Sequence, residues 1–190
     1  MNKSTGNKIN IANILTIFRM LLIFPAVLFV FTLLPFHLIY AFFIFVLAAY
    51  TDYLDGKIAR EYGHITDFGK IMDPLADKLM VISVLVSFCV LNFCPWLPVI
   101  LIAVRETLIT IVRFFILKND KKVIAANKWG KFKTLSQITA VCFIFLFNIL
   151  NESIFLPQNI FIFLNSVSTV LLWLSVIFSW ISAFIYLKGI

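Results

Sequence analysis

Four aspartates in the first half of the chain have the residue type and spacing of a divalent-metal site. Asp52 and Asp55 are three residues apart, and Asp73 and Asp77 are four apart. Each pair therefore shares one face if its segment is helical, and a short polar link would bring the two faces together. Carboxylates crowded beside hydrocarbon repel one another and are costly to desolvate unless cations neutralise them. We expect two divalent ions to do so.

The ligand type and the neighbouring residues indicate which metal and which chemistry. Oxygen ligands suit Mg2+ or Mn2+, and no His or Cys stands nearby at zinc-ligand spacing. Two ions bridged by carboxylates suit phosphoryl transfer, because they hold a pyrophosphate and stabilise the leaving phosphate. The small residues Gly56, Ala59 and Gly69 allow a bulky ligand to approach the backbone. Arg60 is suited to bind a phosphate.

Two simpler explanations stand beside the metal site. The aspartates are ordinary interfacial charges if they pair with the neighbouring cations, which are Lys57, Arg60, Lys70 and Lys78. That explanation accounts for a single aspartate but not for the spacing of all four. Gly56 taken alone is better explained as a helix-packing residue than as a ligand contact.

The composition places these aspartates in a membrane protein. The chain of 190 residues is 62% hydrophobic and only 13% charged, far from the average of soluble proteins. Its formal charge of +7 suits either nucleic acid or an anionic membrane surface, and the hydropathy favours the membrane and excludes nucleic acid. We expect a single domain over residues 1–190. Cys89, Cys94 and Cys142 lie in apolar stretches and are interpreted as small buried hydrophobes.

Six apolar runs predict an all-α fold with six transmembrane helices, since about 20 helical residues cross a bilayer. They are residues 14–34, 36–51, 71–91, 96–117, 135–150 and 160–187. The second and fifth runs are short, so we expect the polar residues around Asp52 and around Lys131 to continue their helices toward water.

The charges of the connections predict the orientation. Residues near 35, 92–98 and 151–159 include no Lys or Arg. The N-terminal segment and residues 56–70 and 118–133 carry most of the sixteen Lys and Arg. Because Lys and Arg concentrate on the cytoplasmic side, both termini and the aspartates are predicted to face the cytoplasm.

The aspartate segment resembles a known motif. Residues 52–77 fit the pattern D-x2-D-G-x2-A-R-x8-G-x3-D-x3-D of the CDP-alcohol phosphatidyltransferase family at every fixed position. The resemblance implies a six-helix membrane fold, commonly dimeric, with a cytosol-facing cavity that binds a CDP-activated lipid and an alcohol acceptor. The motif covers about 26 of the 190 residues and does not specify the acceptor.

Residues outside the motif extend the resemblance to the bacterial members that use glycerol 3-phosphate. They are Asn13, Thr16 and Arg19 near the first apolar run, Arg105, Glu106 and Arg113 in the fourth, and Gly130, Lys131, Lys133 and Thr134 before the fifth. Bacterial members of this kind imply a multi-pass protein of the bacterial cell membrane.

The charged residues of the fourth run also have a physical interpretation of their own. Arg105 and Glu106 lie well inside an apolar run, where ionisable groups are expensive and usually functional. Together with Arg113, Lys131 and Lys133 they would form a basic site for the phosphate of the acceptor. Arg105 is alternatively a buried partner of Glu106 or of a motif aspartate. Lys131 and Lys133 are alternatively anchors for anionic lipid headgroups.

The resemblance implies a mechanism. Asp52, Asp55 and Asp73 would bind two Mg2+ ions that hold the pyrophosphate of CDP-diacylglycerol, and the cytidine nucleotide would lie against Asp52 and a further set of motif residues. That set is Gly56, Ala59, Arg60 and Gly69. Asp77 would bind one metal and act as general base on glycerol 3-phosphate, giving phosphatidylglycerol phosphate and CMP.

Two rival functions remain at this point. With phosphatidylglycerol as acceptor, the same chemistry would yield cardiolipin. From another class, intramembrane carboxylates also line cation channels and transporters, although a transporter does not need small residues and Arg60 at fixed offsets.

Overall fold

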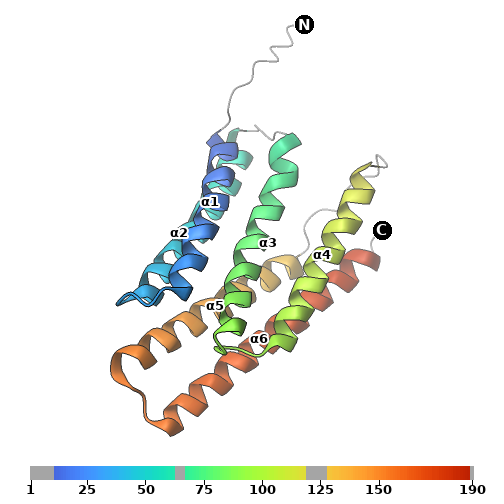
Figure 1. Cartoon of the computed structure of the whole chain (residues 1–190). Helices are drawn as coiled ribbons and strands as arrows, with labels where there is room; N and C mark the ends of the chain where they lie inside the picture. Colours follow the sequence, from blue (N-terminus) through green and yellow to red (C-terminus); the bar gives the residue numbers. More distant parts are fainter. Residues whose placement is uncertain (1–10, 63–66, 119–127, 189–190) are drawn as a thin grey trace, which may run out of the picture.

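Six α-helices make up the computed structural model of the chain, and no strand occurs in the part described (Figure 1). That part is residues 11–62, 67–118 and 128–188. Within it, the side chains of residues 11–13, 53, 55–62, 67–74, 77, 113, 116–118 and 128 lie outside the description. The helices are α1 (Ile11–Phe31), α2 (His37–Tyr62), α3 (Asp67–Val90), α4 (Trp96–Lys118), α5 (Lys128–Ile154) and α6 (Gln158–Lys188).

The helix boundaries confirm the prediction of an all-α fold and extend it at two places. α2 continues past Asp52 to Tyr62, and α5 begins at Lys128, so the polar residues do prolong both helices. α1 ends at Phe31, earlier than its apolar run. Pro35 disfavours helical geometry in Leu34, the residue before it, and the chain turns there with Phe36 at a φ of 62°.

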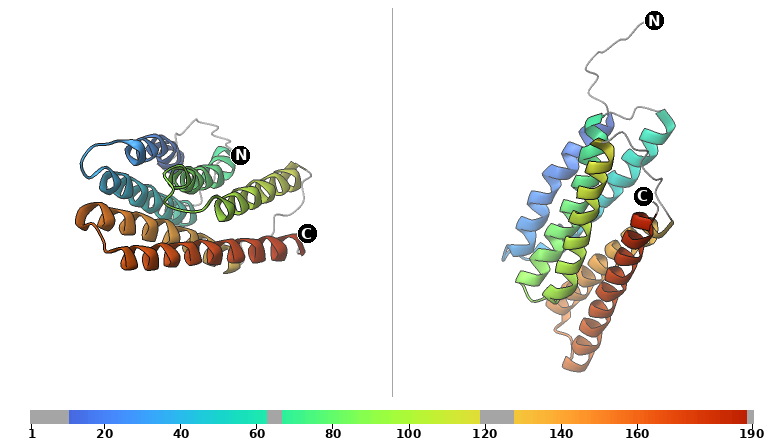
Figure 2. Two further views of the ribbon diagram at one scale, coloured as in Figure 1. Left: turned by 60° about the horizontal axis from the view of Figure 1, so that its bottom comes forward. Right: turned by 90° about the vertical axis from the view of Figure 1, so that its right-hand side faces the viewer.

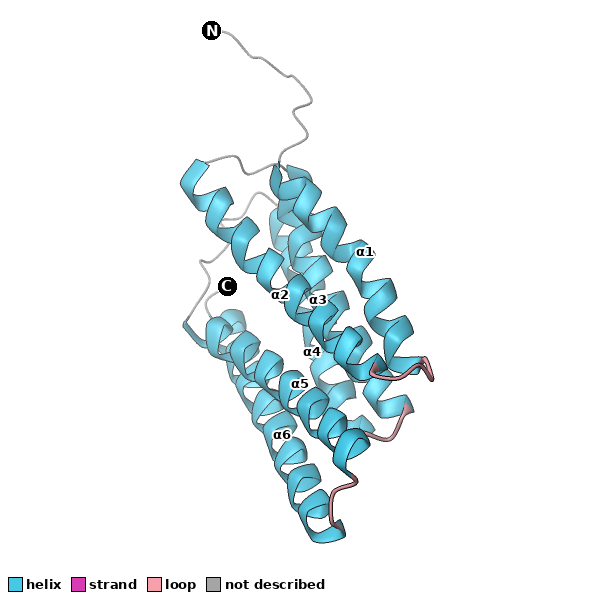
Figure 3. Cartoon of the chain, turned by 90° about the vertical axis from the view of Figure 1, so that its left-hand side faces the viewer, coloured by secondary structure: helices cyan, strands magenta, loops and turns pink. Residues whose placement is uncertain are grey.

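The helices run up and down, so their connections alternate between two ends of the bundle. One end of the bundle holds the first residues of α1, α3 and α5 and the last residues of α2, α4 and α6 (Figures 1 and 3). The other three turns lie at the opposite end. Each contains one residue in the left-handed region: Phe36, Asn92 with φ 59° and Phe155 with φ 48°. α5 and α6 pack along one another on one side of the bundle (Figure 2).

Three helices are long and apolar enough to cross a membrane: α1, α5 and α6. Within the described residues, their apolar spans are Ile14–Phe31, Trp129–Ile154 and Gln158–Lys188, with mean hydropathies of 2.5, 1.6 and 2.2. α2 and α3 contain shorter apolar stretches, His37–Asp52 and Lys78–Val90. The chain is therefore a multi-pass membrane protein, and crossing by all six helices stays a prediction.

A cluster of aromatic rings holds α2, α3 and α5 together. Phe145 of α5 is fully buried, and its ring meets Phe88 of α3 edge-on, with centroids 4.7 Å apart. The rings of Phe42 and Phe45 of α2 lie 5.7 and 6.0 Å from that of Phe145. Edge-to-face and tilted aromatic pairs are the favoured geometries for such contacts. The cluster thus fixes three of the helices that carry the predicted functional residues.

The cysteines lie where the sequence predicted, as small apolar fillers. Cys89 and Cys94 are buried free thiols whose sulfur atoms are 3.5 Å apart, and Cys142 is partly buried against the core. Cys94 lies in the turn between α3 and α4, where burial raises the pKa of its thiol above the ordinary value.

Replacing the central ring of the aromatic cluster is expected to destabilise the bundle. Phe145→Ala should lower the free energy of unfolding by about 3–5 kcal/mol, because the lost ring leaves a cavity between three helices. Thermal unfolding in detergent, followed by tryptophan fluorescence, measures the change. Phe163→Ala on α6, where the side chain is 66% exposed, is the matched control and should unfold like the unaltered protein. Equal losses in both variants would contradict the assignment of this cluster as the core.

Candidate active site

A cavity of about 150 Å³ opens between five of the six helices. None of the described residues that line the cavity comes from α6. They are Arg19 from α1, Phe45, Ala48, Ala49 and Asp52 from α2, Lys78, Met80, Val81 and Ile82 from α3, Ile102 and Glu106 from α4, and Lys133, Thr134, Gln137 and Ile138 from α5. The charged members come from all five helices, whereas most of the others are apolar.

One side of the cavity carries an ion pair between α1 and α2. The buried guanidinium of Arg19 places Nη1 3.0 Å from Oδ1 of Asp52, whose side chain is 41% exposed. A buried charge of this kind needs a partner, and the pairing fixes the carboxylate in turn. Thr16, one turn earlier on α1, is also fully buried. The sequence assigned Arg19 no role, and the structure places it as the support of the first motif aspartate.

The motif itself lies on two consecutive helices. α2 includes Asp52, Asp55, Gly56, Ala59 and Arg60, and α3 includes Gly69, Asp73 and Asp77. Both pairs of aspartates are thus at helical spacing, as predicted, so each pair shares a face of its own helix. Apart from Asp52, the side chains of these residues lie outside the described ones. The convergence of the two pairs stays a prediction.

The described part of the motif fits a hard divalent cation. Asp52 offers carboxylate oxygens, is partly exposed and lines the cavity, and all-oxygen ligands are those that Mg2+ and Mn2+ prefer. Among the described side chains, no three potential metal ligands lie together. The side chains of Asp55, Asp73 and Asp77 lie outside the described part, and the metal site stays a prediction.

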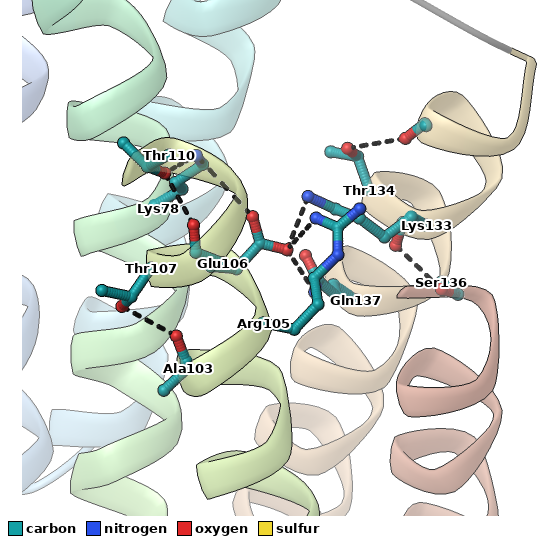
Figure 4. Close-up of polar contacts among 11 residues, drawn as sticks. Lys78, Ala103, Arg105, Glu106, Thr107, Thr110, Lys133, Thr134, Ser136 and Gln137 are labelled. Atoms are coloured by element: carbon teal, nitrogen blue, oxygen red, sulfur yellow. Dashed lines mark hydrogen bonds and ion pairs between the residues drawn. The ribbon is translucent and has the colours of Figure 1, made fainter. Parts of the chain in front are cut away.

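The other side of the cavity is organised around the buried carboxylate of Glu106 (Figure 4). Its Oε1 lies 2.7 Å from Nζ of Lys133 and 2.9 Å from Nη1 of Arg105, and Gln137 donates from Nε2 to the same oxygen at 3.5 Å. Its Oε2 lies 3.9 Å from Nζ of Lys78. Residues of α3, α4 and α5 therefore meet at one carboxylate. We call Glu106, Lys78, Arg105, Lys133 and Gln137 the Glu106 cluster.

Thr110 of α4 fixes Lys78 within this cluster. Its hydroxyl donates to the backbone carbonyl of Glu106 at 2.6 Å and accepts a hydrogen bond from Nζ of Lys78. The ammonium group is thus tied both to the side chain of Glu106 and to the turn of α4 above it. Lys78 and Gln137 were missed as site residues by sequence reasoning. In the sequence, Lys78 directly follows Asp77, and Gln137 stands four residues after Lys133, which is helical spacing.

The predicted acceptor residues are placed differently from one another. Lys133 lines the cavity, whereas Arg105 is buried against Glu106 and is not among the lining residues. This contact corresponds to the alternative of a buried pair. Lys131 is exposed and also outside the lining set. Arg113 on α4 and Asn13 on α1 have side chains outside the described part.

Comparisons with known proteins extend well beyond the motif. The model of the CDP-alcohol phosphatidyltransferase family matches residues 9–181. The chain is 36% identical over 143 residues to a CDP-diacylglycerol–glycerol-3-phosphate 3-phosphatidyltransferase of Bacillus subtilis, covering 75% of this chain and 69% of that protein.

Two proteins with the same name align over more of the chain. The one of Mycoplasma pneumoniae is 32% identical over 199 residues, covering 94% of this chain and 86% of that protein. The one of Rickettsia bellii is 33% identical over 180 residues, covering 95% and 94%. The similarity therefore includes α4 and α5, which carry most of the Glu106 cluster.

A variant at Arg105 distinguishes a supporting contact from a direct contact with a ligand. Arg105→Met should lower the free energy of unfolding by about 1–3 kcal/mol, because Glu106 loses a charged hydrogen bond while Lys133 and Lys78 still neutralise it. Thermal unfolding in detergent measures this loss. Lys131→Met, at an exposed cation of the same region, should leave the unfolding temperature unchanged. Unaltered stability of Arg105→Met would contradict the supporting role.

Proposed function

The chain belongs to the CDP-alcohol phosphatidyltransferase family, and we propose that it transfers the phosphatidyl group of CDP-diacylglycerol to glycerol 3-phosphate, releasing CMP. Relatives that align over nearly the whole chain bear the name of that activity. The observation that carries the choice of acceptor is the Glu106 cluster, which places two lysines in the wall of the cavity. Ammonium groups there suit an acceptor with a phosphate.

The proposed metal ligands are the four aspartates of the motif. Enzymes of this family generally depend on a divalent metal, and we assign two Mg2+ ions, or Mn2+, to Asp52, Asp55, Asp73 and Asp77. When bound, the ions supply neutralisation of the pyrophosphate and of the leaving CMP. Arg19 keeps the carboxylate of Asp52 in place for this purpose, at 3.0 Å. Small residues of the motif, Gly56, Ala59 and Gly69, leave room for the nucleotide, and Arg60 pairs with its phosphate.

The proposed chemical step needs one base. The carboxylate of Asp77 accepts the proton of the primary hydroxyl of glycerol 3-phosphate. The hydroxyl oxygen forms a bond to the phosphorus that carries the diacylglycerol, and the bond between that phosphorus and the oxygen of CMP breaks. An alcohol is a weak nucleophile, so a positioned base and close approach supply what the reaction requires. The acceptor's own phosphate stays at Lys133, away from the bond that is broken.

The proposed topology places this chemistry at the cytoplasmic face of a bacterial cell membrane. The three connections without Lys or Arg lie at the end of the bundle opposite the motif (Figure 1). By the concentration of positive charge on the cytoplasmic side, the motif end and both termini face the cytoplasm. Six crossings follow if the charged residues of α4 turn inward. A homodimer, common in the family, is part of the same proposal.

Removing the proposed base tests the mechanism. Asp77→Asn should reduce the rate of CMP release by about 10²–10⁴-fold, because the acceptor hydroxyl then keeps its proton. The rate is measured in detergent with CDP-diacylglycerol, glycerol 3-phosphate and Mg2+. Glu152→Gln is the control. It also replaces a carboxylate by an amide, but near the C-terminal end of α5, away from the motif, and it should release CMP normally. A wild-type rate for Asp77→Asn would exclude this residue as the base.

A panel of acceptors tests the proposed substrate. With glycerol 3-phosphate, CMP release should exceed that with phosphatidylglycerol, serine or inositol phosphate by at least about tenfold, since only the first is the acceptor named for the relatives. Chelation of Mg2+ should abolish the release. Faster release with phosphatidylglycerol would favour cardiolipin synthesis instead. Ion flux through liposomes without CMP formation would favour a transporter.

A further inference from the structure

The end of the bundle opposite the motif carries one pair of ionisable side chains. Three apolar segments, residues 20–51, 79–104 and 134–187, include no Asp, Glu, Lys, Arg or His other than His37 and Glu152. These two residues meet across the bundle, because Nε2 of His37, the first residue of α2, lies 3.4 Å from Oε1 of Glu152, near the end of α5. Ionisable groups are expensive in such apolar surroundings, so their meeting indicates a specific contact.

Both ring nitrogens of His37 face groups that accept hydrogen bonds. Nδ1 lies 2.9 Å from the backbone carbonyl oxygen of Phe29, near the end of α1, and Nε2 faces the carboxylate of Glu152. A neutral imidazole has a single N–H and can donate to only one of these two acceptors, whichever tautomer it adopts, whereas an imidazolium donates from both nitrogens. Histidine is a stronger base than glutamate, so the extra proton belongs on the ring. His37 therefore joins α1 and α5 at the same time only when it is charged.

The surroundings of the pair shield the ring and leave the carboxylate accessible to protons. His37 and Glu152 line a second cavity, of about 340 Å³, between the turn that joins α1 to α2 and the last turns of α5. Apart from Ser153, the other described lining residues are apolar. The side chain of His37 is 16% exposed and that of Glu152 is 44% exposed. An ion pair in such a partly apolar site is stronger than one on a fully solvated surface.

The neighbouring helices offer no competing charge to the ring. α2 packs against α1, α3 and α5. In the three apolar segments these helices contribute Glu152 and no further Asp, Glu, Lys, Arg or His. The other titratable side chains of the segments are tyrosines and cysteines, which are neutral between about pH 5 and pH 7.5. Among the titratable groups of these segments, the charge that changes in this range is therefore that of His37.

We propose that His37 and Glu152 form a proton-operated latch, which ties the start of α2 to the ends of α1 and α5 while the ring is charged. Histidine loses its proton at about pH 6–7, and glutamate gains one at about pH 4–5. The latch stabilises the bundle between these ranges, and its contribution is lost as the pH rises, because a neutral ring gives up one of its two contacts. By the orientation proposed above, this end of the bundle faces the outside of the cell, so the latch responds to the external pH.

Thermal unfolding in detergent at two pH values tests the latch. At about pH 5.5 the wild type should unfold about 2–4 °C above His37→Gln, because the variant lacks a charge-assisted hydrogen bond. At about pH 8 this difference should fall below about 1 °C. His64→Gln removes the other histidine of the chain and is the matched control, which should unfold like the wild type at both pH values. A difference between the wild type and His37→Gln that is the same at both pH values overturns the latch.

The partner residue gives an independent arm of the experiment. Glu152→Gln should lower the unfolding temperature at about pH 5.5 by a similar amount, and the double variant should lose no more than either single variant, since the two residues share one contact. Additive losses overturn the pairing. If His37→Gln does not fold, the comparison of Glu152→Gln with the wild type at the two pH values decides. Both variants should release CMP normally well below their unfolding temperatures, and loss of CMP release by a folded variant would overturn the separation of the latch from the motif end.

Discussion

The cost of placing charge beside hydrocarbon is the constraint on which this structure depends. An ionisable group inside a bilayer must be paired or face a polar cavity. The bundle meets this requirement by turning Arg19, Arg105 and Glu106 inward, where all three are buried and contact groups of opposite charge. α4 shows the consequence most directly. α4 is not among the helices that are long and apolar enough to cross a membrane, yet one of its charges, Glu106, binds it to α5 and to α3 through the Glu106 cluster.

The apolar core and the ion pairs have separate tasks. Phe145 packs against Phe88 and Phe45 and so fixes the spacing of α5, α3 and α2 on the inner side of the cavity. Small side chains such as Ala48 and Ala49 line the cavity where α2 passes it, which leaves space between the helices. Apolar packing is not directional enough to orient charges, whereas hydrogen bonds and ion pairs are. The packing opens the cavity, and the ion pairs decide which charges face it.

The sequence predicted what depends on a single helix and missed what depends on two. The number of helices follows from the apolar runs, and the continuation of α2 past Asp52 and the start of α5 before Lys131 follow from the shortness of two of those runs. The contacts of Arg19 with Asp52 and of Lys78 with Glu106 join different helices. Periodicity gives the face of a helix on which a residue lies, but not the rotation of that helix against its neighbour. For Arg105 the sequence left two partners open, and only the packing of α4 places its guanidinium against Glu106.

The Arg19–Asp52 pair and the Glu106 cluster are built alike, each with a buried charge that contacts a group of opposite charge in the cavity wall, but the signs of the charges are reversed. On the side of α1 and α2, a buried cation, Arg19, supports a carboxylate that is 41% exposed to the cavity. On the side of α3, α4 and α5, a buried anion, Glu106, supports two lysines that are partly exposed to it. In each case a buried charge contacts an oppositely charged group that lines the cavity. The cavity thus presents a carboxylate on the side of α1 and α2 and ammonium groups on the side of α3 and α5.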